Sequence, residues 1–359
     1  MADAVGVEAR GDGPVSIAPS ELEAWAHATL DRAGASSQAA AATAKVLVDA
    51  NRRGLDSHGV VFLTAYLTRL RVGSTRGDAH PEIVVDSPSL AVIDGRDALG
   101  PYVASFAMRL CCAKARETGA SVAVVRNSSH FGAASCYSEQ AAREGCVGLA
   151  LSNSDPGLAP LGSLGPLLGT NPIAIAAPPG RGGAIPSLDI ATSVVAQGKI
   201  VLAQQAGESI PDGWAIGRDG APTTNPTEAL AGAVLPMGGH KGFGLAFMID
   251  VLTACVAGAQ PSPDVGGDPE STSPQGVSHC FIAIHIESAG SREEYEESLS
   301  RLVSHVREAP RAEWAETLMT PGEPEARASS ERRDLIPLST TAVALLRDVG
   351  RTSGLPFPF

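Results

Sequence analysis

One histidine of the chain lies where proton-transferring side chains are often placed. His130 is in a run of small and polar residues, 126–134, between an apolar segment at 121–125 and a second segment at 135–143. The apolar segment predicts a buried strand, and the Ala, Glu, Gln and Arg content of the second predicts a helix. A histidine in such a turn can give or take a proton near neutral pH. The alternative is a histidine that only hydrogen-bonds its own loop.

A second polar cluster lies at residues 51–59, Asn-Arg-Arg-Gly-Leu-Asp-Ser-His-Gly. It places Arg52, Arg53, Ser57 and His58 beside two glycines, at the junction of two predicted helices. Cationic and hydroxyl side chains at such a junction can bind a polar or anionic small molecule. A solvated loop that ends a helix has the same composition, so the residues alone leave both interpretations open.

A glycine-rich loop, 236–242, leads into a helix predicted over 241–257. Free backbone N–H groups, the positive end of the helix dipole and Lys241 are together typical of an anion site. The alternative is a solvated lysine. Because a lysine is electrostatically disfavoured at a helix start, its place among three glycines favours phosphate binding.

Hydroxyl and amide side chains recur where three apolar runs end, at residues 152–156, 168–174 and 188–193. Such groups can line a nucleotide site through neutral hydrogen bonds. They are also the residues of ordinary turns, which is the simpler interpretation of each segment alone.

The composition and the missing motifs argue against several functions. The net charge is −12 and there is no Lys/Arg cluster, so neither nucleic acid nor a membrane is expected as a partner. No GxGxxG follows a strand, and GxxxxGK[ST] and HExxH are absent. The sequence therefore predicts no Rossmann turn, no P-loop and no catalytic metal. Six cysteines without CxxC spacing are typical of a reduced, cytoplasmic protein.

The N-terminal part of the chain is predicted to be helical after a loose tail at residues 1–17. Residues 19–50 predict two helices that are broken near Gly34. Ser20 is the predicted N-cap of the first helix, with Glu23 completing a capping box.

From residue 81 onward short apolar runs alternate with helical stretches, which predicts an α/β protein with a substantial sheet. The predicted strands are 83–85, 90–93, 121–125, 147–151, 172–177 and 281–286. The further predicted helices are 60–71, which precedes the sheet, and 103–117, 135–143, 241–257, 292–308 and 340–349. Two polar segments are expected to be loop or coil, namely 261–275 and 321–333.

Seven segments, read in chain order, resemble the type-2 malate/L-lactate dehydrogenase family over about residues 22–346. They are 53–59, 127–132, 154–156, 168–172, 189–193 with 198–199, 210–214 and 236–245. Each is weak alone, and their shared order is specific. The resemblance implies an oxidoreductase that uses NAD or NADP, acts on a small molecule and forms a homodimer.

The resemblance also implies a fold. It is an α/β fold in which a non-Rossmann, sheet-based cofactor domain accompanies a mostly helical domain built from both chain ends. The domains expected from it are a tail at 1–17, a helical domain at 18–80 with 290–359, and a cofactor-binding domain at 81–289.

Roles for single residues follow from the same resemblance. The proton-transfer residue matches His58 in some relatives and His130 in others, and no metal takes part. The positions implied for substrate binding are Ser57, Arg53 and Phe62. The positions implied for cofactor binding are Ser154, Asp189, Ile190, Ala191, His240, Lys241, Gly322 and Glu323.

Phe62 departs from the family pattern, because relatives usually carry there an arginine that binds the substrate carboxylate. Its loss would weaken carboxylate binding by roughly 1.5–3 kcal/mol unless Arg52, Arg53 or Arg69 substitutes. The main expectation is hydride transfer between nicotinamide and a 2-oxo or 2-hydroxy acid. The alternatives are a reductase of a cyclic imine or neutral ketone, which Phe62 favours, and a non-catalytic ligand-binding relative.

Overall fold

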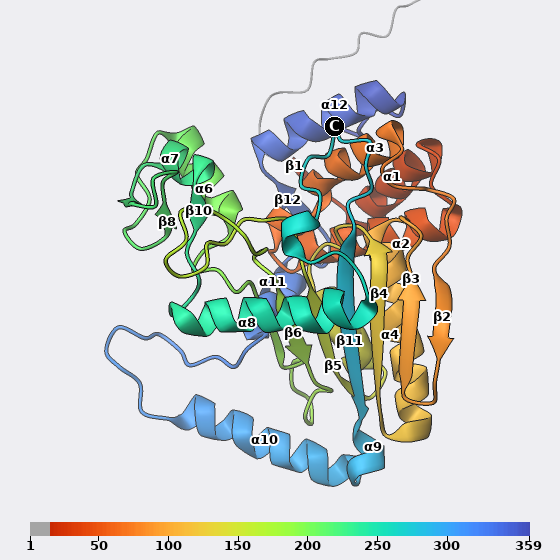
Figure 1. Cartoon of the computed structure of the whole chain (residues 1–359). Helices are drawn as coiled ribbons and strands as arrows, with labels where there is room; N and C mark the ends of the chain where they lie inside the picture. The colour runs from red at the N-terminus through yellow and green to blue at the C-terminus, as the bar shows by residue number, and fades with distance from the viewer. Residues whose placement is uncertain (1–14) are drawn as a thin grey trace, which may run out of the picture.

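A computed structural model describes residues 15–359 and has a mixed sheet of seven strands at its centre (Figure 1). The strands are β2 (Glu82–Asp86), β3 (Leu90–Asp94), β4 (Ala120–Ser128), β5 (Cys146–Ser152), β6 (Ile173–Ala176), β7 (Ser187–Ile190) and β11 (Val277–His285). Their order is β2-β3-β4-β11-β5-β6-β7. Within this sheet β3 and β4 pair in parallel and all other neighbours are antiparallel. The predicted α/β class is confirmed.

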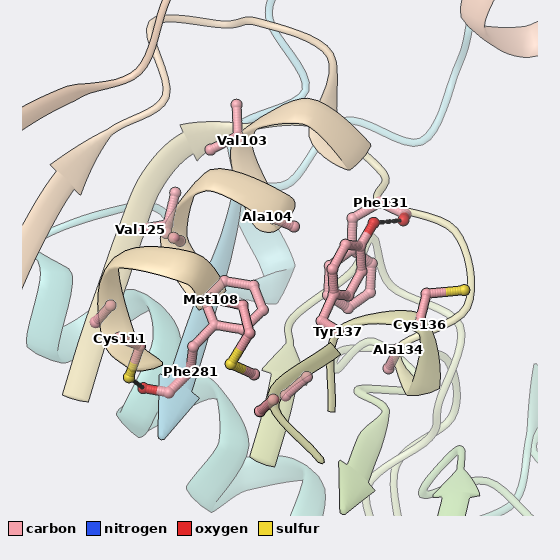
Figure 2. Close-up of a cluster of buried hydrophobic side chains, with 14 of the residues drawn as sticks. Val103, Ala104, Met108, Cys111, Val125, Phe131, Ala134, Cys136, Tyr137 and Phe281 are labelled. Atoms are coloured by element: carbon pink, nitrogen blue, oxygen red, sulfur yellow. Dashed lines mark hydrogen bonds between the residues drawn. The ribbon is translucent and has the colours of Figure 1, made fainter. Parts of the chain in front are cut away.

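Helices cover both faces of the sheet. On one face α4 (Gly100–Thr118) contacts β4 and β11, and α5 (Ser135–Arg143) contacts β5 and β6. On the other, α8 (His240–Asp250) and the π-helical turn η3 (Val251–Cys255) contact β5, β4 and β11. Figure 2 shows the core under α4 and α5, where the fully buried side chains include Met108, Val125, Tyr137 and Phe281. Burial on both faces explains why the central strands are apolar runs rather than alternating ones.

The two ends of the described chain meet in a helical layer above the sheet (Figure 1). It consists of α1 (Pro19–Arg32), α2 (Ser37–Arg52), α3 (Leu63–Val72), α12 (Thr340–Ser353) and the antiparallel pair β1 (Val15–Ile17) and β12 (Ile336–Leu338). Its core contains Leu22, Leu47 and Leu346. The predicted break at Gly34 is confirmed, and this residue has a φ of 93°.

A small lobe lies beside the sheet and leads into the glycine-rich loop before α8 (Figure 1). It contains α6 (Gln197–Ala206), α7 (Pro226–Ala231) and a sheet in the order β10-β8-β9, formed by β8 (Ala215–Ile216), β9 (Pro222–Thr223) and β10 (Ala233–Val234). Ile200 and Ile210 belong to its own core.

The helices between β11 and β12 are α9 (Ile286–Ala289), α10 (Arg292–Glu308) and α11 (Glu323–Glu331). In Figure 1, α10 lies at the far end of the sheet from α1 and α3. It contacts the β6–β7 connection, where the Tyr295 hydroxyl donates to the carbonyl oxygen of Pro178 at 2.7 Å. α11 returns to the end of α2, where a Cβ at Gly54 would lie 3.5 Å from Ala328.

Two predictions about local structure were wrong. The N-cap of α1 is Ala18 and not Ser20, because Pro19, whose fixed φ suits a first helical position, starts the helix earlier. Residues 321–333 contain the helix α11 and are not coil. The proline in this segment lies in the first turn of α11, where it is compatible with a helix.

The predicted tail lies partly outside the described residues. Residues 1–14 are not described, while Val15–Ile17 pair with β12 as strand β1. Among residues 15–359 no helix is both long and apolar enough to cross a membrane.

Candidate active site

His58 ends a short 3-10 helix, η1 (Asp56–His58), directly after α2. The side chain of Asn51, in the last turn of α2, fixes this connection, because its Oδ1 accepts from the backbone N–H of Val60 at 2.8 Å. A Cβ at Gly59 would lie 2.2 Å from that same Oδ1. The glycine of the Ser-His-Gly sequence is therefore required by the close approach of Asn51.

His130 lies in the turn between β4 and α5, as the sequence predicts. The hydroxyl of its neighbour Ser129 accepts from the backbone N–H of Gly100 at 2.8 Å. A Cβ at Gly100 would lie 2.2 Å from the carbonyl oxygens of Ser129 and His130, so α4 can approach this turn only with glycine there. The backbone N–H of His130 donates to Oε1 of Gln275 at 2.9 Å.

The fold brings the two histidine motifs together. The ring centroids of His58 and His130 are 6.1 Å apart, with planes 25° from parallel. Phe62, in the 3-10 helix η2 (Val60–Phe62), stacks on His130 at 4.4 Å and 8°. The position at which the family resemblance implies an arginine is thus filled by a ring that lies flat against one of the candidate catalytic residues.

The hydrogen bonds of His130 define which ring nitrogen carries its proton. Its Nδ1 lies 2.9 Å from the Tyr66 hydroxyl and 3.4 Å from the backbone nitrogen of Gly132. Burial raises the pKa of Tyr66, so its hydroxyl stays protonated. A backbone N–H can only donate, so Nδ1 is an acceptor and the proton of the neutral ring is on Nε2.

Both histidines are partly buried, and burial lowers the pKa of each. The pKa of His130 falls to about 3, with further lowering from the charges of His58, His279 and Arg69. The pKa of His58 is also lowered, while the carboxylate of Asp189 acts in the opposite direction. Both rings are therefore neutral at pH 7, and Asp189 favours a proton on His58.

Arg53 is held away from the histidines in a buried network. Its Nη2 lies 2.5 Å from Oε1 of Glu139, and its Nη1 donates to the Ser135 hydroxyl at 2.9 Å. Oδ2 of Asp189 in turn accepts from the Ser135 backbone N–H at 2.8 Å and from its hydroxyl at 2.6 Å. The guanidinium predicted to bind substrate is thus already paired with a carboxylate of the chain.

Of two other predicted positions, Ser57 contacts His58 and Arg52 lies in a separate cavity. Ser57 is exposed, and its hydroxyl lies 3.0 Å from Nδ1 of His58. Arg52 lines a cavity of about 800 Å³ between α2, α4, α5 and α11, and neither histidine is part of its lining.

Most of the predicted cofactor positions gather at one end of the sheet. A Cβ at Gly169 would lie 2.4 Å from the hydroxyl of Ser154. Thr192 donates from its backbone to the carbonyl of Thr170 at 2.9 Å, and its own carbonyl accepts from the N–H of Met237 at 2.9 Å. These contacts bring together Ser154, Asp189, Ile190, Ala191, His240 and Lys241.

Lys241 is an exposed cation in the first turn of α8. Gly238 and Gly239 before it have φ of 57° and 63°, which a glycine adopts without strain. A Cβ at Gly242 would lie 2.5 Å from the carbonyl oxygen of Met237, so the loop is tightly folded. Within residues 15–359 the ammonium group has no ion-pair partner, which leaves it available to an anion.

Gly322 and Glu323 lie at the other end of β7. The backbone N–H of Ser187 donates to Pro321 at 3.1 Å, and a Cβ at Gly322 would lie 2.7 Å from the carbonyl oxygen of Ile185. Glu323 is paired with Arg307 and is not among the residues near Lys241.

Sequence reasoning missed Tyr66 and Gln275 as partners of His130. A signal for Tyr66 was present, because Phe62, Tyr66 and Arg69 are at i, i+4 and i+7 and so share one face of the predicted helix. Gln275 lies in a polar loop whose composition gives no such signal.

Comparisons with known proteins show the family of this chain. Residues 17–347 match the family model described as malate/L-lactate dehydrogenase. The L-sulfolactate dehydrogenase of Methanocaldococcus jannaschii is 38% identical over 329 residues, which is 91% of this chain and 94% of the relative. A solved structure of the sulfolactate dehydrogenase from that organism covers 95% of this chain and 98% of its own, with 36% identity and a TM-score of 0.88.

Two further relatives differ in the chemistry that their names state. The (2R)-3-sulfolactate dehydrogenase (NADP(+)) of Chromohalobacter salexigens is 39% identical over 267 residues, covering 74% of this chain and 79% of the relative. The structure of delta1-piperideine-2-carboxylate reductase from Pseudomonas syringae pvar. tomato has a TM-score of 0.83 at 27% identity, covering 93% of this chain and 99% of its own. With a match of this extent, the chain belongs to the malate/L-lactate dehydrogenase family and is an oxidoreductase.

Proposed function

We propose that this chain transfers a hydride between NAD or NADP and carbon 2 of a 2-oxo or 2-hydroxy acid. The observation that carries the proposal is the pair His58 and His130, placed face to face with the Nε2–H of His130 left for a substrate. In the reductive direction the hydride goes to carbon 2, and the Nε2–H of neutral His130 donates a hydrogen bond to the carbonyl oxygen and stays on the ring. The proton that turns this oxygen into a hydroxyl group comes from His58 in its protonated form, which Asp189 favours and solvent restores.

The cofactor proposal is supported by the residues around Ser154, which follows β5, and Lys241, in the first turn of α8. Gly169 and Gly242 are close-packed there and leave no room for side chains, and the ammonium group of Lys241 has no ion-pair partner within residues 15–359. A cation at the positive end of a helix suits the pyrophosphate of a dinucleotide. When bound, the nicotinamide supplies or accepts the hydride, and Lys241 holds the phosphates. Both cofactors remain in the proposal, since neither is favoured by a described contact.

The test is turnover of purified protein with NADH or NADPH against 2-oxo acids, cyclic imines and ketones, followed by cofactor absorbance. His130→Asn and His58→Asn are measured beside the wild type. We expect the variant that lacks the proton-transfer residue to lose roughly 100-fold or more in kcat while keeping its thermal unfolding temperature. If neither substitution lowers turnover, the assignment of both histidines is wrong.

A cyclic imine is the second candidate substrate. Phe62 favours it, because the ring leaves no guanidinium at the position where relatives hold a carboxylate. The structural likeness to delta1-piperideine-2-carboxylate reductase supports the C=N chemistry and not the lack of a carboxylate, because the compound in that name carries one. Faster turnover of cyclic imines than of any 2-oxo acid in the same panel would select this alternative.

We also propose a homodimer in which two copies meet over α8. The outer face of α8 and η3 carries a row of exposed apolar side chains, which are Phe247, Met248, Leu252 and Val256. Such a contiguous apolar row is typical of a protein contact. Light scattering is expected to give a dimer for the wild type and a monomer for Phe247→Glu. A monomeric wild type would contradict the proposal.

A further inference from the structure

Arg69 is a buried cation beside the two histidines. It lies on α3, on the helix face that also carries Phe62 and Tyr66, and only 5% of it is exposed. The Tyr66 hydroxyl is bonded to Nδ1 of His130, and the positive charge of Arg69 contributes to the low pKa of His130. Arg69 thus lies one helical turn beyond the tyrosine whose hydroxyl is bonded to His130.

This cation has no ion-pair partner within residues 15–359. Its Nη2 donates to the carbonyl oxygen of Gly267 at 3.1 Å, and no carboxylate oxygen lies within 4.0 Å of it. The charges of Asp155 and Asp268 attract it from farther away, yet burial still lowers its pKa. Buried arginines are normally paired, because an uncompensated buried charge is costly. An anion bound beside His130 would supply the missing partner.

The other arginines considered for this role are engaged elsewhere. Arg53 is paired with Glu139 and bonded to Ser135. Arg52 lines a cavity that contains neither histidine. Of the three candidates, Arg69 is the one on the helix face that carries Tyr66, whose hydroxyl is bonded to Nδ1 of His130.

We propose that Arg69 binds the substrate carboxylate and so replaces the arginine that relatives carry at the position of Phe62. The inference rests on the proposed function and names how its substrate is recognised. In this proposed pose, the carbonyl next to the bound carboxylate accepts a hydrogen bond from the Nε2–H of His130. Phe62 then covers the ring of His130 instead of contacting the carboxylate.

The test compares charged and neutral substrates of the same shape. Pyruvate and 2-oxobutyrate are each measured beside their 2-oxo amides, with NADH and NADPH. The wild type is expected to prefer the acids in kcat/KM. Arg69→Gln should lower kcat/KM for the acids by roughly ten- to a hundredfold while changing that for the amides and the KM for the cofactor little. Arg69→Lys, which keeps the charge and loses the planar fork, should retain part of the preference.

Arg71→Gln is the matched control. Arg71 is on the same helix, is exposed, and pairs with Glu270 at 2.8 Å on the loop that also contacts Arg69. Its loss should leave the ratio of acid to amide unchanged. If Arg69 had only a structural role, its loss would lower kcat/KM for the acid and for the amide by the same factor. The ratio of the two kcat/KM values therefore separates substrate binding from folding.

The outcomes distinguish this inference from the proposed function. The inference is overturned if the wild type turns over acids and amides with equal kcat/KM. It is also overturned if Arg69→Gln leaves the acid-to-amide ratio of kcat/KM unchanged. In both cases the proposed reductase function still holds. No turnover of any 2-oxo acid, among these compounds or in the wider panel, would reject both. If Arg69→Gln does not fold, the ratio in Arg69→Lys decides, since an unchanged ratio there also overturns the role.

Discussion

A histidine at the centre of the sheet makes the stability of the fold depend on pH. His279, in β11, is fully buried, with Nδ1 at 2.9 Å from the Ser152 hydroxyl and Nε2 at 2.9 Å from the Ser128 hydroxyl. Its ring stacks on Phe131 at 4.5 Å. Burial lowers the pKa of His279 from 6.5 to about 3. A neutral ring, with one donor and one acceptor, matches two hydroxyl groups without burying a charge.

The sign and size of the effect follow from proton linkage. Between pH 6.5 and about 3 the unfolded chain binds a proton at His279 and the folded chain does not. Its stabilising contribution is thus complete above pH 6.5 and is lost as pH falls, by up to about 1.4 kcal/mol per pH unit. From pH 6.5 to 4.5 the loss is roughly 2.3 kcal/mol. That is a large part of the roughly 5–15 kcal/mol by which a typical domain is stable.

The assay is urea unfolding of the wild type and His279→Gln between pH 4.5 and 7.5. Glutamine keeps a donor and an acceptor for Ser128 and Ser152 and does not titrate. The variant should be less stable at pH 7, because it loses the stack on Phe131. Its free energy of unfolding should nevertheless fall less steeply with decreasing pH, by about 1.4 kcal/mol per unit. The pKa of His130 is also about 3. Because His130 is present in both proteins, its contribution to the pH dependence cancels in the difference between their slopes. Equal slopes would refute the reasoning.

Two more predictions concern the site. Lys241→Ala should raise the KM for the nicotinamide cofactor far more than that for the substrate, since the charge lies at a glycine-rich helix start. Steady-state kinetics with both concentrations varied measures this, and equal effects on the two constants would contradict the placement. Phe62→Arg should bring no gain with 2-oxo acids in the wild type, where Arg69 already supplies a cation, and roughly a tenfold gain in kcat/KM in Arg69→Gln. A tenfold gain in the wild-type background would instead show that the site lacks its carboxylate partner.

Local patterns located most elements of the fold. The helices predicted at 135–143 and 292–308 coincide with α5 and α10, because both have strong helix formers and a clear stop or cap. The helix α11 was missed, because its proline and serines are also typical of coil. The N-cap of α1 was misplaced for a related reason, since a favourable cap at Ser20 competed with a proline already inside the first turn.

The candidate site was predictable only in part. His58 and His130 could be singled out because each lies in a short polar segment between elements. Their approach to one another depends on how the helical layer packs on the sheet, and no local pattern contains that information. The same limit applies to Arg53, whose type and position suited a substrate anion. Its partner Glu139 comes from another helix, and only the tertiary structure shows that the two are paired.

The packing of α2 explains why the two histidines are held in a fixed relation. Val46 belongs to the core under α4 and α5, while the next residue, Leu47, belongs to the core of the helical layer. The helix α2 therefore packs into both cores, and His58 lies six residues beyond its last residue, Arg52, in the short helix η1. Movement of the helical layer against the sheet would have to disrupt one of the two cores. The contact between Tyr66 on α3 and His130 at the end of β4 then relies on packing that already stabilises the fold.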